Sequence, residues 1–307
     1  MIIFKPTFFK KLFFAVLLLI FFPITNAGSQ QNFRVLDSSG VKIIFEKGLE
    51  AGARKVENLF PYVQNKTESL FGFKGKSRPT VVLIKTRQRF LKIADHPITM
   101  AFAVPGKNLI VIDYSKVITH PFSLESTFLH EFCHLALHHN IRDIPRWLDE
   151  GTCQWASGGV DEIIYGNNQS ALNLAAVTES YLSFRDLSNG FPERKNQRVL
   201  AYQQSKSFID FIVENYGKEK FIEILKRMRQ GYNADSVFYE VLGSRVPELE
   251  KKWRQTLSGR LTWLTWLSSN LYEVLFFCAA LITVFGFFKL IRKKRNYADN
   301  DSDDYEE

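Results

Sequence analysis

The spacing of hydrophobic positions changes along the chain and separates two kinds of secondary structure. Short runs rich in β-branched and aromatic residues predict strands before residue 114. These runs are 41–45, 80–85, 100–104 and 108–113, the last two joined by a Pro105-Gly106 turn. Apolar positions three and four residues apart predict helices at 49–70, 87–94 and 124–139. A small sheet is therefore expected ahead of a helical region.

The second half of the chain reads as helical after one interruption. A loop-rich stretch is expected at 158–198, followed by helices that end near Gly217 and Gly231, because glycine commonly caps a helix C-terminus. A last helix is expected at 246–257. Without an internal repeat, the pattern predicts an α+β fold, a small mixed sheet followed by a helical subdomain.

Both ends of the chain carry membrane-related patterns. Three lysines precede an apolar run at 12–22, and Thr25-Asn26-Ala27 offers small residues for cleavage, which predicts a signal peptide at 1–27. An uncut anchor is the alternative, and it would leave residues 28–262 on the same side of the membrane. Near the other end, 271–291 has about the length and apolarity that a membrane span requires.

The flanks of this segment predict its orientation. The basic run Arg292-Lys293-Lys294-Arg295 is typical of the cytoplasmic side, and Trp263 and Trp266 suit the outer interface. We therefore expect a single-pass membrane protein with an extracytoplasmic domain at 28–262, which is periplasmic in a Gram-negative cell. A juxtamembrane segment and transmembrane helix follow at 263–291, with a cytoplasmic tail at 292–307. A buried core helix is the alternative for 271–291.

Composition excludes one class of partner. The net charge of +8 arises from 40 basic and 32 acidic residues. No basic helix and no alternation of aromatic with basic residues accompanies this excess, so no nucleic-acid partner is expected.

The residues with the most specific chemistry are His130-Glu131-Phe132-Cys133-His134, an HExxH sequence inside the predicted helix 124–139. Four-residue spacing places both histidines on one helix face, where they can bind one zinc ion while Glu131 polarises a bound water. The alternative is a helix that merely carries two histidines on a polar stripe.

A catalytic zinc also requires a third protein ligand. The metzincin pattern fails because Asn140 stands where its third histidine is needed, and His138 lies about 12 Å along the helix axis from His130. We expect His138 and His139 to be exposed. Glu150, sixteen positions after His134, fits better, because Asp143 and Pro145 indicate a second helix that can turn back on the first.

These motifs resemble one known family. HEFCH, the stretch 145–151 with sequence PRWLDEG, and weaker similarity at 201–205, 216–217 and 249–253 are similar to peptidase MA-like gluzincins, distant relatives of thermolysin and the M1 aminopeptidases. The resemblance covers roughly residues 40 to 258. It implies a gluzincin-like metallopeptidase subdomain.

The resemblance also implies roles for particular residues. By its position in the motif, Tyr202 would stabilise the oxyanion of the reaction, although it also suits a helix residue packed on the core. The edge strand, either 100–104 or 108–113, would bind the substrate backbone by strand addition. A carboxylate that orients a ligand histidine is expected in zinc sites, and both Asp149 and Glu125 are available.

The resulting hypothesis is a membrane-anchored zinc metallopeptidase with His130, His134 and Glu150 as Zn²⁺ ligands and Glu131 as general base. Its partner would be a peptide or protein substrate. One alternative is a catalytically inactive, peptidase-like binding or assembly module. Another is a zinc hydrolase that acts on a non-protein substrate.

Two of the three cysteines lie close to proposed ligands. Cys133 lies inside the HExxH sequence and Cys153 three residues after Glu150. In an oxidising compartment they could link the two helices by a disulfide, and the competing interpretation is two buried thiols. Cys278 lies within the predicted span, where we expect an apolar, membrane-facing residue.

Overall fold

The computed structural model describes residues 33–73, 78–119, 122–158 and 170–302, with side chains omitted at 170, 259–269, 291 and 293–302. The predicted signal peptide, 1–27, lies outside the described residues. The chain divides into two units, one that ends at Trp253 and one that begins at Arg254. They are described separately below.

The first unit contains a mixed sheet of five strands. These are β1 (Phe33–Asp37), β2 (Lys42–Glu46), β3 (Thr80–Ile84), β4 (Ala101–Val104) and β5 (Leu109–Asp113). Their spatial order is β1-β2-β3-β5-β4, with the two inner pairs parallel and the two outer pairs antiparallel. Four strands agree with the hydrophobic pattern. The fifth, β1, was not predicted, because its outward position leaves Arg34 and Val35 exposed and its pattern weak.

The sheet also distinguishes the two candidates for an edge strand. Every residue of β5 is buried, and β5 is paired on both sides. β4 is paired with β5 alone, through a turn at Pro105–Lys107 in which Asn108 adopts a left-handed φ of 52°. Asparagine tolerates this conformation better than most residues. Of the two candidates, β4 therefore lies at an edge of the sheet, opposite β1, and β5 is excluded from that role.

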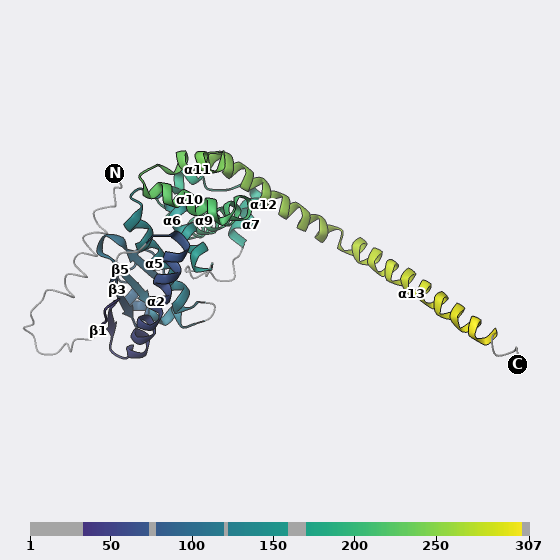
Figure 1. The fold of residues 1–307 in the computed structure, drawn as a ribbon, viewed down its shortest axis with the longest axis horizontal. Coiled ribbons are helices and arrows are strands. Elements are labelled where there is room, and N and C mark those ends of the chain that lie inside the picture. The colour runs from purple at the N-terminus through teal and green to yellow at the C-terminus, as the bar shows by residue number, and fades with distance from the viewer. Residues whose placement is uncertain (1–32, 74–77, 120–121, 159–169, 303–307) are drawn as a thin grey trace, which may run out of the picture. The chain divides into compact units, whose positions relative to one another are not determined.

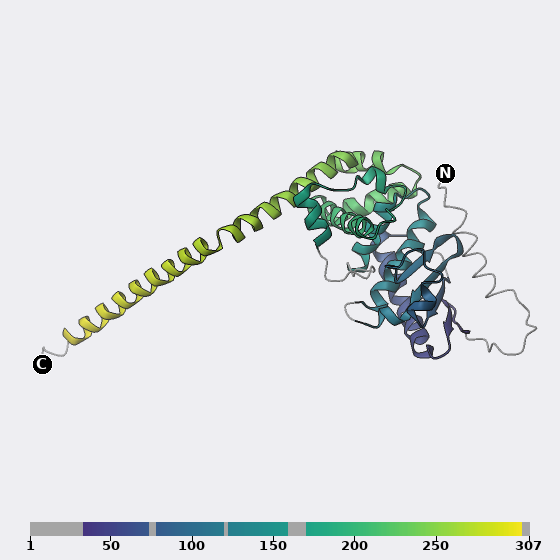
Figure 2. The ribbon, with the colours of Figure 1, turned by 180° about the vertical axis from the view of Figure 1, so that it is seen from behind.

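Two long helices cover one face of the sheet. α2 (Glu50–Phe71) and α5 (Leu124–Asn140) pack together against the apolar side chains of β2, β3 and β5. Phe60 of α2 meets Phe132 of α5 edge to face, at 5.8 Å between ring centroids. Figures 1 and 2 show both helices beside the sheet from opposite sides. This packing leaves the middle of α5 without solvent contact.

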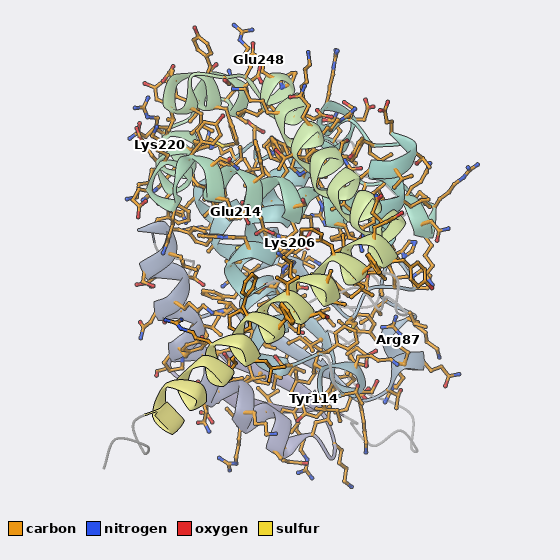
Figure 3. The ribbon with its side chains drawn as sticks, turned by 90° about the vertical axis from the view of Figure 1, so that its right-hand side faces the viewer. Arg87, Tyr114, Lys206, Glu214, Lys220 and Glu248 are labelled. Atoms are coloured by element: carbon orange, nitrogen blue, oxygen red, sulfur yellow. A yellow bond between two sulfur atoms is a disulfide. The ribbon has the colours of Figure 1, made fainter. Side chains whose placement is uncertain are left out.

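The remaining helices of the first unit form its second half. α6 (Arg146–Ser157) packs on α9 (Lys195–Tyr216), and both α6 and β4 pack on α5. α10 (Lys218–Arg229) and α11 (Ala234–Leu242) extend this half. Figure 3 shows the two halves, with Arg87 and Tyr114 in the half that holds the sheet and Lys206, Glu214 and Lys220 among the helices.

One glycine permits the close approach of α6 to α9. A Cβ atom at Gly151 would lie 2.5 Å from the backbone oxygen of Ser205. Aromatic rings also pack around α6, where Trp147 meets Phe184, Phe208 and Phe238 in tilted or edge-to-face pairs with 5.0 to 5.9 Å between centroids. α6 is thus held firmly along one side.

The helical half differs from expectation at several boundaries. The stretch 158–198 is not all loop, because it contains α7 (Ser170–Thr178), α8 (Phe184–Leu187) and the start of α9. The helix predicted at 87–94 is shorter, α3 (Arg87–Phe90), and α4 (Tyr114–Val117) and α11 were not predicted. The last helix predicted, 246–257, is longer, α12 (Val246–Ser269). Gly217 caps α9 as expected.

The second unit contains one long apolar helix. α13 spans Leu271–Ser302, and its segment Leu271–Leu290 has a mean hydropathy of 2.1 with none of it buried. By length and composition this segment is able to cross a membrane.

Candidate metal centre

The histidines of the HExxH sequence, His130 and His134, lie in the buried middle of α5. The helix begins after Ser123, whose hydroxyl accepts the Ser126 backbone N–H at 3.1 Å, as an N-cap residue does. Its four-residue spacing places His130 and His134 side by side, with the two Nε2 atoms 2.8 Å apart. Both histidines are buried.

The third predicted donor comes from α6, which begins immediately after Pro145. Proline suits a helix start because its φ is fixed and it has no N–H to leave unpaired. Glu150 lies at the second turn of this helix and is buried. Its Oε2 atom lies 3.5 Å from the Nε2 atoms of both His130 and His134.

These three side chains form a group that fits a metal ion. One ligand atom from each of His130, His134 and Glu150 lies within 4.8 Å of the others. Among the described residues, the buried Oε2 atom of Glu150 has no hydrogen-bond partner, which is costly for a carboxylate oxygen away from water. Two imidazoles and one carboxylate are the donor set of a catalytic zinc site. A cation bound here would satisfy the unpaired oxygen.

Asp149 contacts two histidines of α5, His134 and His138. Its Oδ1 lies 2.7 Å from His134 Nδ1, and its Oδ2 lies 3.0 Å from His138 Nε2. Asp149 is therefore the carboxylate that orients a histidine, whereas Glu125, the other candidate, lies exposed in the first turn of α5. His138 and His139 are exposed as expected, but His138 has a partner that its position on α5 did not reveal.

The two carboxylate oxygens of Glu150 have different partners, and Arg146 is the partner of one of them. Its Nη2 donates to Glu150 Oε1, while Oε2 is the atom that faces the histidines. The same guanidinium lies 3.5 Å from Asp149 Oδ2 and 6.0 Å from the centroid of Phe191. Sequence reasoning missed Arg146, although its i,i+4 spacing from Glu150 on a predicted helix was a usable signal.

Charge within this group shifts the pKa values of its members. Burial disfavours the charged carboxylate of Glu150, but Arg146 and then His134 outweigh burial and hold the pKa of Glu150 well below its usual value. Burial likewise disfavours protonated His134, but Asp149 and Glu150 outweigh it and raise the pKa of His134 well above its usual value. Without a metal, the group is thus a network of ion pairs.

Tyr202 extends from α9 toward the same group. Burial raises the pKa of its phenol, and the charge of Glu150 raises it further, while Arg146 opposes the shift. The phenol therefore keeps its proton at ordinary pH. Its ring packs edge to face on Phe191 and beside the buried side chains of Ile98 and Val199.

Glu131 follows His130 on α5 and is 3% exposed. A helix turns by about 100° per residue, so Glu131 leaves the helix on a neighbouring face. It belongs to the same buried segment of α5 as the two histidines.

A disulfide joins the two helices next to the donors. Cys133 and Cys153 are bonded, with their Cα atoms 5.5 Å apart, and this confirms the disulfide hypothesis over two free thiols. Ligand atoms of His134, Asp149 and Cys153 also lie within 4.8 Å of one another. The disulfide removes Cys153 from that second set, because a metal binds the thiolate.

Comparisons with known proteins complete the description of the first unit. A family model described as the Peptidase MA superfamily matches residues 96–259. The chain finds no match among curated proteins. Among solved structures, a variant of the M1 zinc metallopeptidase from Deinococcus radiodurans is similar at 17% identity and a TM-score of 0.45, over 73% of this chain and 50% of that one.

A second solved structure is leukotriene A4 hydrolase from Saccharomyces cerevisiae. It is similar at 12% identity and a TM-score of 0.40, over 77% of this chain and 39% of that one. The chain spans half the length of the M1 metallopeptidase that it matches.

Proposed function

Because the chain belongs to the Peptidase MA superfamily, whose model matches residues 96–259, we propose that it is a gluzincin-type zinc metallopeptidase held in a membrane by one helix. The observation that carries the proposal is the meeting of His130 Nε2, His134 Nε2 and Glu150 Oε2, with the last atom buried and without a hydrogen-bond partner among the described residues. Zn²⁺ prefers this mixture of two imidazoles and one carboxylate when it serves catalysis.

His130, His134 and Glu150 would hold the ion, and Asp149 would keep the His134 ring in place through Nδ1. Zinc bound by such a set acts as a Lewis acid and makes water a stronger nucleophile at neutral pH. Arg146 would keep Glu150 Oε1 occupied, so that Oε2 is the oxygen presented to the metal.

Glu131 is the general base of this proposal. It would accept a proton from the attacking water and later pass that proton to the leaving amine. Tyr202, which keeps its phenolic proton, would donate a hydrogen bond to the oxygen that becomes negative when water adds to the amide carbonyl. These two residues come from different helices, α5 and α9.

The free edge of β4 supports a peptide as the substrate. β4 lies against α5, and its outer edge is unpaired within the described sheet. An extended peptide can add to such an edge through main-chain hydrogen bonds, which places successive peptide bonds along the strand. This arrangement favours a peptide over an ester or other non-protein substrate.

Membrane anchoring rests on the segment Leu271–Leu290 and on the basic residues that follow it. We infer an extracytoplasmic domain at 28–262, with the tail 292–307 in the cytoplasm, since basic residues mark the cytoplasmic side. Protease added to intact cells should digest the domain and spare a tag placed after Glu307. Digestion of the tag instead would reverse this topology.

The metal and the base are tested on the full-length chain purified in detergent. About one zinc per chain is expected in the wild type by elemental analysis, and much less in Glu150→Ala. Glu131→Gln should keep its zinc and lose cleavage of a peptide library by at least about a hundredfold. Equal cleavage by wild type and Glu131→Gln would refute the general base, and a wild type that binds no zinc would refute the metallopeptidase.

A further inference from the structure

We propose that Arg146 binds a carboxylate of the substrate, so that cleavage occurs beside a free C-terminus or beside an acidic side chain next to the scissile bond. The proposal rests on the peptidase function above and adds a substrate class to it. It follows from the exposure of Arg146, from how its guanidinium is held, and from its distance to the three metal donors.

Arg146 is the exposed member of a buried cluster. Its side chain keeps 43% of its surface accessible, whereas the side chains of Asp149 and Glu150 keep 1% and 2%. His130 and His134 are 2% and 8% accessible at their side chains. The accessible part of this cluster is therefore a guanidinium, which stays positively charged throughout the ordinary pH range.

The guanidinium is fixed in place on one side. Glu150 Oε1 and Asp149 Oδ2 accept from it, and the Phe191 ring lies 6.0 Å from its central carbon. A guanidinium carries five N–H donors, so these contacts leave donors for another acceptor. A fixed planar fork with free donors is suited to bind a carboxylate through two parallel hydrogen bonds.

The position of Arg146 sets how far this carboxylate lies from the scissile bond. Arg146 and the two histidines contact opposite oxygens of the same carboxylate, Glu150. The guanidinium is thus separated from the metal-ligating atoms by about the width of one carboxylate group. In a peptide, successive residues are about 3.8 Å apart, so the terminal carboxylate follows the last peptide carbonyl at a similar distance. A terminal carboxylate on Arg146 would place the last peptide bond at the donors.

Arg198 offers a matched comparison. Like that of Arg146, its positive charge lowers the pKa of the Tyr202 phenol. Its side chain, however, is only 11% accessible. Its Nε donates to the Pro192 carbonyl at 2.9 Å, and its other nitrogens face Asp95 and Glu193 at 3.8 and 3.5 Å. Arg198 is already surrounded by acceptors, so it should contribute nothing to recognition of a substrate carboxylate.

The test uses one peptide library in three forms on the zinc-loaded, full-length chain. The forms carry a free C-terminal acid, a C-terminal amide, or the amide with glutamate at the last position. Wild type should cleave the acid form at least about tenfold faster than the amide, as a charge-assisted hydrogen bond permits. If the acidic side chain is the source, the glutamate amide should recover that rate instead.

Variants then assign the preference to Arg146. Arg146→Gln should cleave acid and amide equally, Arg146→Lys should keep part of the preference, and Arg198→Gln should keep all of it. A ratio between two forms within one variant is insensitive to lost protein or lost zinc. Binding affinity gives a readout apart from turnover. A peptide that wild type cleaves is titrated, in its acid and its amide form, into Glu131→Gln and into the double variant Glu131→Gln, Arg146→Gln. The acid should bind more tightly only where Arg146 is present.

Two results would overturn the proposal. Equal cleavage of all three forms by wild type would remove the carboxylate-binding role and leave the peptidase intact. An acid preference that persists in Arg146→Gln would assign recognition elsewhere. Cleavage of none of the forms by the zinc-loaded wild type would instead refute the proposed function itself, and the inference with it.

Discussion

Asp149 holds His134 from the side opposite the metal donors, with Asp149 Oδ1 2.7 Å from His134 Nδ1. Because Nδ1 faces this carboxylate, Nε2 is the nitrogen directed toward His130 and Glu150. The second oxygen of Asp149 contacts His138, so one carboxylate joins two turns of α5 to the start of α6. The orientation of a metal donor thus depends on a residue that does not itself belong to the donor set.

Replacing Asp149 by asparagine should weaken metal binding. The amide loses the charge that orients His134, and loss of such a partner typically costs ten- to a hundredfold in metal affinity. Competition with a chelator on the purified chain measures the change. Glu125→Gln removes a carboxylate from the exposed first turn of α5 and should leave affinity unchanged. Equal losses in both variants would contradict an orienting role for Asp149.

The same pair predicts a pH dependence for the metal-free chain. Against the effect of burial, Asp149 raises the pKa of His134 and His134 lowers the pKa of Asp149. The histidine contributes stability below its unfolded pKa of about 6.5 and loses it as pH rises through the higher folded value. Asp149 contributes stability above its unfolded pKa of about 3.9, and this contribution is lost as pH falls through its lower pKa in the folded state.

The pair should therefore stabilise the metal-free fold most between about pH 4 and 6.5. Thermal unfolding of the metal-stripped chain should give a larger Tm difference between wild type and Asp149→Asn at about pH 5.5 than at about pH 10. A difference that does not change with pH would show that Asp149 acts by packing alone.

The disulfide should stabilise the pairing of α5 with α6. Cys133 and Cys153 are separated by 20 residues, and a loop of this size corresponds to about 3 kcal/mol of unfolded-chain entropy. A Cys133→Ser, Cys153→Ser double variant should unfold at a lower temperature and lower denaturant concentration. Adding reductant should lower the stability of wild type but not of the double variant. No difference between wild type and variant would mean that the bond is absent in solution.

Substitution of Gly151 should disturb α6 and, within it, the preceding residue Glu150. An added Cβ would lie 2.5 Å from the Ser205 backbone oxygen, which cannot move without moving α9. Overpacking of this kind costs about 1 to 3 kcal/mol. Gly151→Ala should thus lower Tm and reduce metal affinity. Gly190→Ala, where a Cβ meets no atom of the described residues within 4 Å, is the control and should change neither.

The sequence predicted the parts of the site that depend on short spacing. His130 and His134 are related by helix periodicity, and Glu150 by a tight turn between two helices, so their meeting follows from local geometry. The strands of the sheet interior were predicted because burial on both faces leaves a continuous apolar run, as in β5. β1 lacks that signal because it is an exposed edge.

Two kinds of contact were not predicted from the sequence. One brings together segments far apart in the chain, and the other joins polar side chains on adjacent helices. Tyr202 comes from α9, and only a family resemblance assigned it a role. His138 and Arg146 gain their partners on Asp149 and Glu150 from the angle at which α5 meets α6, which depends on aromatic packing behind Trp147. The choice of β4 over β5 as the edge strand required the strand order. Hydrophobic spacing carries none of this information.

The closeness in sequence of the metal donors has a consequence for folding. All three donors and the disulfide lie between residues 130 and 153, within two helices joined by a short turn. Contacts between near neighbours along the chain cost little loop-closure entropy and form early, whereas contacts with α9 close a longer loop. A nascent chain could therefore assemble and load the metal centre before α9 and Tyr202 arrive. The order of synthesis would then keep the proposed active site incomplete until α9 has folded.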